Sequence, residues 1–213
     1  MEKLFTGVLG SLSPKEQVKI FSVGEIIKVH KGQIIIKEGS LENDLYLIQE
    51  GAFKGYKVDE IGRELTLMYF KSGDFVGEIS FLTQSPRTAN IIAQSSGTLI
   101  KLTRDQFASL TKEHQGLLYL ISKELAFRLK YATDKFASSV FKDVVDRLKR
   151  VLQDLSEDSY LSEPEEKLVR TEYSIQELAS LVGTSREVVS RGIKALIASG
   201  ELRKEGKMFW VKD

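Results

Sequence analysis

Residues 174–191 constrain the fold of this chain more than any other segment, because they predict two short helices joined by a tight turn. Ser174, followed three residues later by Glu177, fits the capping box that begins many helices. The apolar side chains that follow recur at helical spacing: Leu178, Leu181 and Val182. Gly183 then permits a sharp turn, because glycine adopts a positive φ at little cost. The segment therefore predicts a supporting helix that ends at a glycine turn.

A second helix is expected after this turn. Thr184 and Glu187 fit another capping box, and the helix that they open carries polar side chains on one face: Arg186, Glu187, Ser190 and Arg191. A helix-turn-helix needs these parts in this order, because early side chains of its second helix reach base edges in the DNA major groove. Arginine can donate two hydrogen bonds to guanine, and glutamate can accept one from cytosine. We therefore predict a helix-turn-helix.

The composition narrows the class of protein. The 213 residues include 31 basic and 30 acidic side chains, so the arrangement of charges, not their sum, must specify any nucleic-acid contact. The absence of cysteine excludes disulfides, thiolate zinc sites and cysteine-ligated iron–sulfur clusters. No 18-residue apolar run and no signal-peptide pattern is present, so we expect a cytoplasmic protein with no membrane partner.

Catalytic chemistry is not expected from these residues. The chain has only two histidines, and it shows neither a nucleophile–base pair nor a cluster with metal-ligand spacing. We therefore predict that the protein is not an enzyme, holds no metal and needs no obligatory cofactor.

Residues from about 24 to 104 have the pattern of an all-β domain. Short β-rich runs alternate with glycines, as at residues 33–36, 44–48, 52–58 and 65–70. Residues 60–63 look like a hairpin connection. This regular spacing of strands and turns predicts a barrel or a sandwich.

A long helix is expected over about residues 113–139. Its stripe follows a heptad spacing: Leu118, Ser122, Leu125, Leu129, Ala132 and Phe136. Such a seam favours pairing with a second copy of the chain. The alternative is that the helix packs on its own β domain. A break at residues 138–139 and a capping residue, Asp143, place a domain boundary there, giving domains 1–139 and 140–213.

The C-terminal domain is predicted to be a winged helix. An apolar helical face begins at Val144, and residues 156–167 form a polar, acidic segment that we predict to be a loop. Residues 202–211 predict a β-hairpin that turns near Gly206. A helix-turn-helix followed by such a hairpin is a winged helix.

Residues 73–89 have the composition of an anion site. Backbone N–H groups at the start of a one-turn helix can bind an anion, and Arg87 and Thr88 can add side-chain donors. Glu78 does not suit a phosphate, but its carboxylate can accept a hydrogen bond from a ribose hydroxyl. These residues together suggest a sugar phosphate as ligand. The alternative is that Arg87 and Glu78 pair with each other.

Nearly the whole chain resembles the cyclic-AMP receptor protein / fumarate–nitrate regulator (CRP/FNR) superfamily. The family's phosphate-binding cassette has the form G-E-[IL]-[AS]-L-L followed by P-R-[ST]-A. It is matched by Gly77-Glu78-Ile79-Ser80 and by Pro86-Arg87-Thr88-Ala89. The resemblance implies an α+β fold with an N-terminal β-roll (the cyclic-nucleotide-binding jelly roll), a long dimerisation helix and a C-terminal winged helix-turn-helix.

The resemblance also assigns an effector site. It implies that Arg87 and Thr88 hold a cyclic phosphate, that Ser80 and its neighbours Gly77 and Ile79 contribute to that contact, and that Glu78 binds the ribose 2′-hydroxyl. The family's cyclic-AMP binder places two hydroxyl residues against the adenine, whereas this chain has Ala132-Thr133, so only Thr133 remains. The family hinge falls at Phe141 and Asp143.

The recognition helix matches the family at Arg186, Glu187 and Arg191, which implies a half-site resembling TGTGA. Ser190 departs toward the fumarate–nitrate branch. Further side chains are candidate phosphate contacts: Ser185, Lys194, Arg203, Lys204 and Lys207.

We therefore expect a homodimeric, sequence-specific transcription regulator controlled by a small effector, with cyclic AMP the expected ligand. Its expected partners are double-stranded DNA, a second copy and RNA polymerase. One alternative is a regulator that is constitutive or answers a non-nucleotide signal. Another is a nucleotide-sensing adaptor whose winged helix binds protein.

Overall fold

The computed structural model describes residues 9–141, 143–157, 166–169, 173–205 and 208–212. It confirms the α+β class, with helices and antiparallel sheets. The chain divides into two compact units, one formed by residues 1–57 and 66–130 and the other by residues 58–65 and 131–213. The division falls inside the long helix, so the boundary predicted between residues 139 and 140 stays a prediction.

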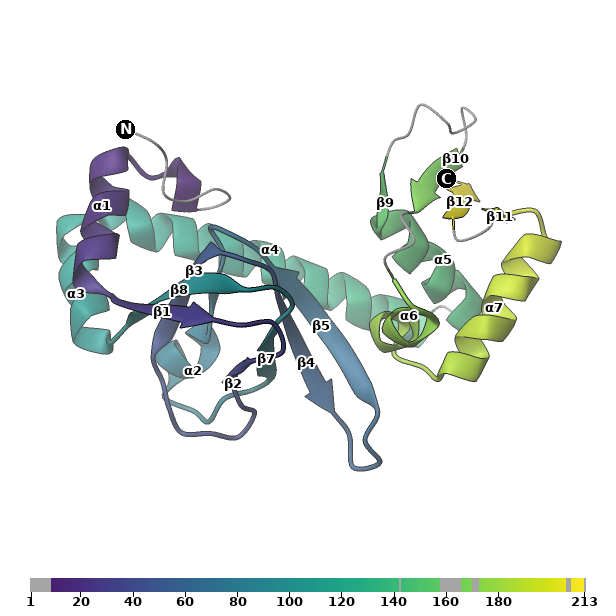
Figure 1. Cartoon of the computed structure of the whole chain (residues 1–213), viewed down its shortest axis with the longest axis horizontal. Helices are drawn as coiled ribbons and strands as arrows, with labels where there is room; N and C mark the ends of the chain where they lie inside the picture. Colours follow the sequence, from purple (N-terminus) through teal and green to yellow (C-terminus); the bar gives the residue numbers. More distant parts are fainter. Residues whose placement is uncertain (1–8, 142, 158–165, 170–172, 206–207, 213) are drawn as a thin grey trace. The chain divides into compact units, whose positions relative to one another are not determined.

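The first unit is the predicted β-roll with helices at one side (Figure 1). One sheet has the order β1-β8-β3-β6 and the other the order β2-β7-β4-β5. Their strands are β1 (Glu25–Val29), β2 (Ile34–Ile36), β3 (Leu45–Glu50), β4 (Phe53–Val58), β5 (Glu64–Phe70), β6 (Phe75–Val76), β7 (Asn90–Ala93) and β8 (Gly97–Leu102). The predicted connection at residues 60–63 is confirmed as a hairpin, where Asp59 N donates to Arg63 O at 3.0 Å.

Strand β3 explains how this unit forms layers. Its first four side chains are all buried, and because successive side chains in a strand point to opposite faces, they enter two different cores. Tyr46 and Ile48 belong to the core between the sheets. Leu45 and Leu47 belong to a second core, beneath the helices. The helices of this unit are the 3-10 turn η1 (Leu9–Ser11), α1 (Pro14–Val23), α2 (Glu78–Thr83), α3 (Arg104–Glu113) and the first part of α4 (Gln115–Phe141).

The second unit contains the predicted winged helix. Helices α5 (Val144–Asp154), α6 (Ile175–Val182) and α7 (Arg186–Ala198) share one apolar core with the strands β11 (Leu202–Glu205) and β12 (Met208–Lys212). The predicted cap is confirmed at Asp143, whose carboxylate accepts from Asp146 N at 2.9 Å. Helix α4 continues past the seam break at residues 138–139 and ends at Phe141.

Two sequence predictions about this unit are wrong in detail. The segment predicted as a loop over residues 156–167 instead supplies β9 (Ser156–Glu157) and the start of β10 (Glu166–Val169). These strands extend the wing to the order β11-β12-β10-β9, and Leu168 pairs with Trp210. A pairing partner that lies far along the chain leaves no local signal in an acidic, polar segment.

The second capping residue also differs from the prediction. Ser185, not Thr184, is the N-cap of α7, and its Oγ accepts from Val188 N. Thr184 N instead donates to Ala179 O at 3.0 Å, so Thr184 completes the end of α6. The box predicted at Ser174 and Glu177 is confirmed.

Candidate effector pocket and DNA-contacting surface

The cassette helix α2 begins at a residue that must be glycine. Gly77 is its N-cap and has a φ of 85°, a backbone conformation that residues with a Cβ rarely adopt. A Cβ at this position would lie 2.4 Å from Arg87 Nη1 and 3.0 Å from Asp44 O. Glycine therefore provides both the turn into α2 and the space that the Arg87 guanidinium occupies.

Arg87 is held almost entirely inside the protein, with 3% of its surface exposed. Its Nη1 donates to Gly77 O and to Ser80 Oγ, both at 2.9 Å, and its Nη2 donates to Asp44 O at 2.7 Å. Its Nε is buried without a hydrogen-bond partner. Burial lowers the pKa of Arg87 from its ordinary value, while nearby Tyr46 and Asp44 oppose that shift. The Nε–H of this buried guanidinium is therefore an unused donor.

The other residues predicted for the effector site differ in burial. The Ser80 hydroxyl is buried, accepts from Arg87 and donates to Gly77 O at 3.3 Å, so it positions the arginine. Ile79 and Thr88 are exposed. Thr133 is an exposed residue of α4 in the second unit, and its contact with a base stays a prediction.

The alternative prediction, an ion pair between Glu78 and Arg87, is wrong. Glu78 Oε1 lies 3.2 Å from Arg128 Nη1, and both side chains are largely buried. Arg87 bonds instead to carbonyl oxygens and Ser80. The two cassette residues therefore have separate partners, and Glu78 faces helix α4.

Arg128 is a site residue that the sequence analysis missed. All three of its guanidinium nitrogens contact protein acceptors: Nε donates to Glu124 Oε1 at 3.0 Å, Nη1 contacts Glu78, and Nη2 donates to Phe75 O at 2.8 Å. Its cation also lies over the Phe75 ring at 4.5 Å. The spacing of Glu124 and Arg128, four residues apart, was the only signal in the sequence. Arg128 therefore ties α4 to both ends of the turn that precedes α2.

Arg104 fixes the other end of the cassette helix. It donates through Nη2 to Phe81 O, and its cation lies 5.3 Å from the Phe81 ring. The same ring packs edge-to-face on Phe107 of α3, with 5.1 Å between centroids. Helix α2 is therefore attached to both α3 and α4, so a displacement of α2 would strain both contacts.

Asp74 lies beside this network and carries a carboxyl group that is partly removed from water. Burial raises its pKa above the ordinary value, although the hydrogen bond from Lys71 N and the charge of Arg128 act in the opposite direction. Glu124 adds to the upward shift of the pKa.

Replacing Asp74 with asparagine is expected to raise the free energy of unfolding near neutral pH. The pKa of Asp74 is higher in the folded than in the unfolded chain, so the wild type gains stability as pH falls through the folded-state pKa. The amide cannot take up that proton but can still accept from Lys71 N. The stability difference between the variant and the wild type should therefore shrink as pH falls, and thermal melting of both proteins at about pH 7 and about pH 4 would measure it. A difference in melting temperature that is the same at both pH values would contradict this account.

The predicted dimer seam on α4 is exposed in the single chain. Leu129 and Phe136 are 69% and 71% exposed, and Leu118, Ser122 and Ala132 are exposed as well. Leu125 packs partly against the roll. The roll is covered by another face of α4, through Leu117 and Ile121. The helix thus packs on its own domain and also leaves the seam exposed in the single chain.

Helix α7 presents the predicted polar face to solvent. Arg186, Glu187, Ser190, Arg191 and Lys194 are all exposed. Its opposite face is buried, where Gly192 lets α7 approach Leu148, since an added Cβ would lie 2.9 Å from Leu148 Cδ2. Hydrogen bonds from its own backbone N–H and from Ser185 lower the pKa of Glu187, so its carboxylate is ionised at neutral pH.

The wing cations are partly engaged with aromatic rings. Arg203 stacks on Trp210 with 4.2 Å between the guanidinium carbon and the ring centroid, and Lys204 lies 5.3 Å from the Phe209 centroid. Lys207 lies outside the described residues, as does the Phe141 side chain at the predicted hinge. Arg203 therefore has a structural role, in addition to any contact with phosphate.

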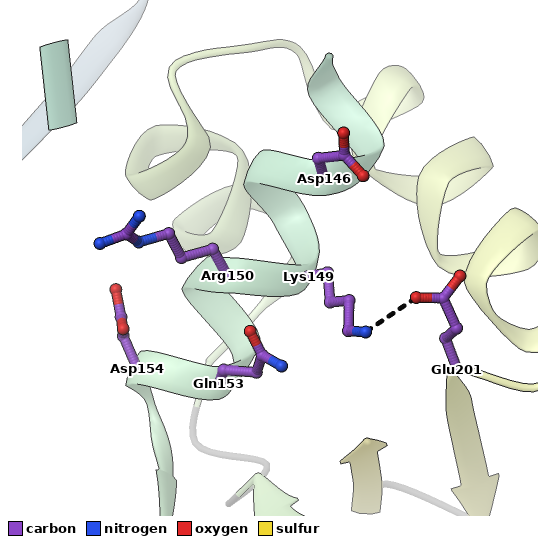
Figure 2. Close-up of a pocket in the computed structure, with 6 residues that line it drawn as sticks. All are labelled: Asp146, Lys149, Arg150, Gln153, Asp154 and Glu201. Carbon is purple, nitrogen blue, oxygen red and sulfur yellow. Dashed lines mark ion pairs between the residues drawn. The ribbon is translucent and has the colours of Figure 1, made fainter. Parts of the chain in front are cut away.

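A hollow on the outer face of α5 is unrelated to the cassette. Figure 2 shows its lining residues: Asp146, Lys149, Arg150, Gln153, Asp154 and Glu201. Lys149 Nζ pairs with Glu201 at 2.9 Å. Carboxylates and cations are mixed here, so the hollow offers no preference for either sign of charge. In the described parts of the chain no group of acidic or histidine residues could hold a metal ion, and no helix is both long and apolar enough to cross a membrane.

Comparison with known proteins gives matches over both units. The model of the cyclic nucleotide-binding domain matches residues 26–114, and that of the Crp-like helix-turn-helix domain matches residues 146–213. CRP-like protein Clp of Xanthomonas campestris pv. campestris (strain B100) is 34% identical over 180 residues, covering 81% of this chain and 77% of the relative.

Solved structures agree with these matches. The c-di-GMP responsive global regulator CLP of Xanthomonas campestris has a TM-score of 0.80 at 29% identity, covering 94% of this chain and all of that one. A transcriptional regulator of the CRP/FNR family from Thermus thermophilus has a TM-score of 0.69 at 25% identity, covering 89% of this chain and 94% of that one.

Proposed function

Because the chain belongs to the CRP/FNR family of transcription regulators, we propose that it binds a palindromic TGTGA-like DNA site as a homodimer under the control of cyclic AMP. Four side chains of α7 read the bases: Arg186, Glu187, Ser190 and Arg191. Further side chains contact phosphates: Ser185, Lys194, Arg203, Lys204 and Lys207. RNA polymerase is a further partner, and the protein acts in the cytoplasm, where the DNA is.

The observation that carries the effector proposal is the unused donor of Arg87. A buried donor without a partner costs free energy, and a phosphate oxygen would satisfy it with a charge-assisted hydrogen bond. Thr88 lies next to Arg87 with an exposed side chain and adds a hydroxyl donor. Glu78 is positioned by Arg128 and accepts from the ribose 2′-hydroxyl.

Coupling between effector and DNA needs an element that both influence, and α4 is that element. It contacts the cassette through Arg128 and carries the exposed seam. An effector that binds the DNA-competent dimer more tightly shifts the population toward it. The hinge at Phe141 and Asp143 allows the winged helix to change orientation.

Titration of the purified protein with cyclic AMP, while measuring its affinity for a palindromic TGTGA-type duplex, tests the proposal. The affinity for the palindromic duplex should rise as cyclic AMP is added, whereas the affinity for a scrambled duplex should not. Calorimetry that detects binding of neither cyclic AMP nor cyclic GMP would reject control by a cyclic mononucleotide. If cyclic di-GMP does not bind either, tight DNA binding by the ligand-free protein would identify a constitutive regulator. Failure to enrich any sequence from a random DNA library would favour the protein-binding adaptor.

A cyclic dinucleotide is the second candidate effector. The observation that favours it is the structural similarity to CLP, which is described as c-di-GMP responsive. The same titration with cyclic di-GMP compares the two candidates directly.

Replacing Arg191 with alanine is expected to remove discrimination at one base pair of each half-site, at a cost of about 1–3 kcal/mol. Arg191 is exposed on the polar face of α7, so its removal should leave the fold intact. Competition between the palindrome and duplexes substituted at single positions measures the effect. An unchanged ratio of specific to non-specific binding would exclude Arg191 from base recognition.

A further inference from the structure

The two arginines of the effector pocket differ in how their charge is compensated. In the described part of the chain no carboxylate lies within ion-pair distance of Arg87, which bonds to two carbonyl oxygens and a hydroxyl. Arg128 contacts two carboxylates, Glu78 at 3.2 Å and Glu124 at 3.0 Å. Arg87 is therefore available to neutralise an anion, whereas Arg128 is already neutralised inside the protein.

Carboxylates exceed cations around Arg128. Glu78 and Glu124 bring two negative charges to one guanidinium, and Asp74 is close enough for Arg128 and Glu124 to influence its pKa. All of these side chains are largely or partly buried, so solvent screens their charges less than it would at the surface. Arg87 thus has no carboxylate within ion-pair distance in the described residues, whereas the surroundings of Arg128 carry an excess of negative charge.

We propose that Glu124, supported by Asp74, is a specificity residue that favours effectors with one negative charge over cyclic dinucleotides, which carry two. This inference rests on the proposed control by a nucleotide bound at Arg87. The first phosphate of either ligand is neutralised by Arg87. A second phosphate needs a second cation, and Glu124 already engages Arg128, the arginine that pairs with Glu78. Such a phosphate meets the carboxylates instead and is repelled.

Glu124→Gln isolates this charge effect from the structural role of the residue. Glutamine has the same length, and its amide oxygen can still accept from Arg128 Nε, so the tie between α4 and the cassette is kept. Only the negative charge is lost, so the net charge of Arg128, Glu78 and residue 124 together changes from −1 to zero. For a second phosphate about 12 Å from residue 124 and an effective dielectric constant of about 20, this change favours its binding by on the order of tenfold.

The experiment compares calorimetric affinities of cyclic AMP and cyclic di-GMP for the full-length wild type, Glu124→Gln, Asp74→Asn and a control, Glu113→Gln. Glu113 lies on α3 in an exposed ion pair with Lys19 at 3.4 Å, away from the cluster. The wild type should bind cyclic AMP more tightly. Glu124→Gln should raise the relative affinity for cyclic di-GMP by about tenfold, Asp74→Asn should change it in the same direction, and Glu113→Gln should leave it unchanged.

An affinity ratio that stays within about twofold in Glu124→Gln would overturn the inference while leaving nucleotide control intact. A wild type that prefers cyclic di-GMP would also overturn it. A wild type that binds neither ligand rejects the proposed control itself, and the inference with it. If thermal melting shows that Glu124→Gln does not fold, Asp74→Asn decides the question, because it removes a charge without touching the Arg128 contacts.

Discussion

Gly77→Ala is expected to lower the affinity for cyclic AMP by about 10- to 100-fold, the range for losing a hydrogen bond to a charged group. The new Cβ would lie 2.4 Å from Arg87 Nη1, so the guanidinium has to leave its position between Gly77, Ser80 and Asp44. Because Arg87 is the cation that faces the phosphate in the proposed complex, its displacement removes the main anion contact. Calorimetry with cyclic AMP measures the loss.

Gly32→Ala is the matched control for this variant. Gly32 has φ 84°, nearly the same as Gly77, but a Cβ there would meet no atom within 4 Å. Both variants therefore carry the backbone strain of a left-handed alanine, about 1–2 kcal/mol, and only one displaces Arg87. Gly77→Ala should lose more stability than Gly32→Ala, because it also displaces Arg87 from three hydrogen bonds. A loss of affinity in Gly77→Ala alone would support the proposed role. Unchanged affinity in Gly77→Ala would place the effector elsewhere.

Leu129→Glu is expected to dissociate the dimer and, with it, tight binding to a palindrome. Leu129 is 69% exposed in the single chain, so the substitution should spare the fold of the protomer. In a symmetric dimer the Leu129 side chains of both copies are buried in the seam. Burial of each side chain contributes about 1.5–3 kcal/mol to the free energy of dimerisation. The dimer dissociation constant should therefore rise by about 100- to 10,000-fold. Analytical ultracentrifugation at micromolar concentration, together with DNA titration, measures both effects.

Phe127→Glu controls for adding charge to the same helix. Phe127 is 59% exposed, but it lies two residues before Leu129 and therefore on the opposite side of the helix. It should leave the dimer and its DNA affinity unchanged. A monomeric Phe127→Glu, or a dimeric Leu129→Glu, would show that the seam at Leu118, Leu125, Leu129 and Phe136 is not the pairing face.

Much of the candidate effector site was predictable from the sequence because the cassette is a short, contiguous motif. Arg87, Glu78 and Gly77 were predicted as site residues, and Gly77 has a positive φ that suits glycine. The motif could not predict which residues the Glu78 and Arg87 side chains contact. Glu78 pairs with Arg128 of α4 and not with Arg87, although Arg87 is much closer to it along the chain. Which arginine meets a carboxylate depends on how α4 lies against the roll.

The predicted recognition helix, α7, shows the same distinction on a smaller scale. The exposed polar face of α7 follows from helical periodicity, and it was predicted correctly as a surface. The N-cap residue of α7 was not predicted correctly. Thr184 and Ser185 are adjacent and both are good N-cap residues, so the sequence alone does not distinguish them. In the structure Thr184 N donates to Ala179 O at the end of α6, and Ser185 Oγ accepts from Val188 N at the start of α7.

The sequence by itself determined the features that neighbouring residues control: the capping box at Ser174, the glycine turn at Gly183 and the cassette motif. These depend on interactions within a few residues, so their pattern is visible along the chain. The tertiary structure alone decided the pairing of Glu78 with Arg128, the burial of Asp74 and the addition of β9 and β10 to the wing. Ion pairs, desolvation and strand pairing depend on distances in space, and those distances exist only once the elements have packed.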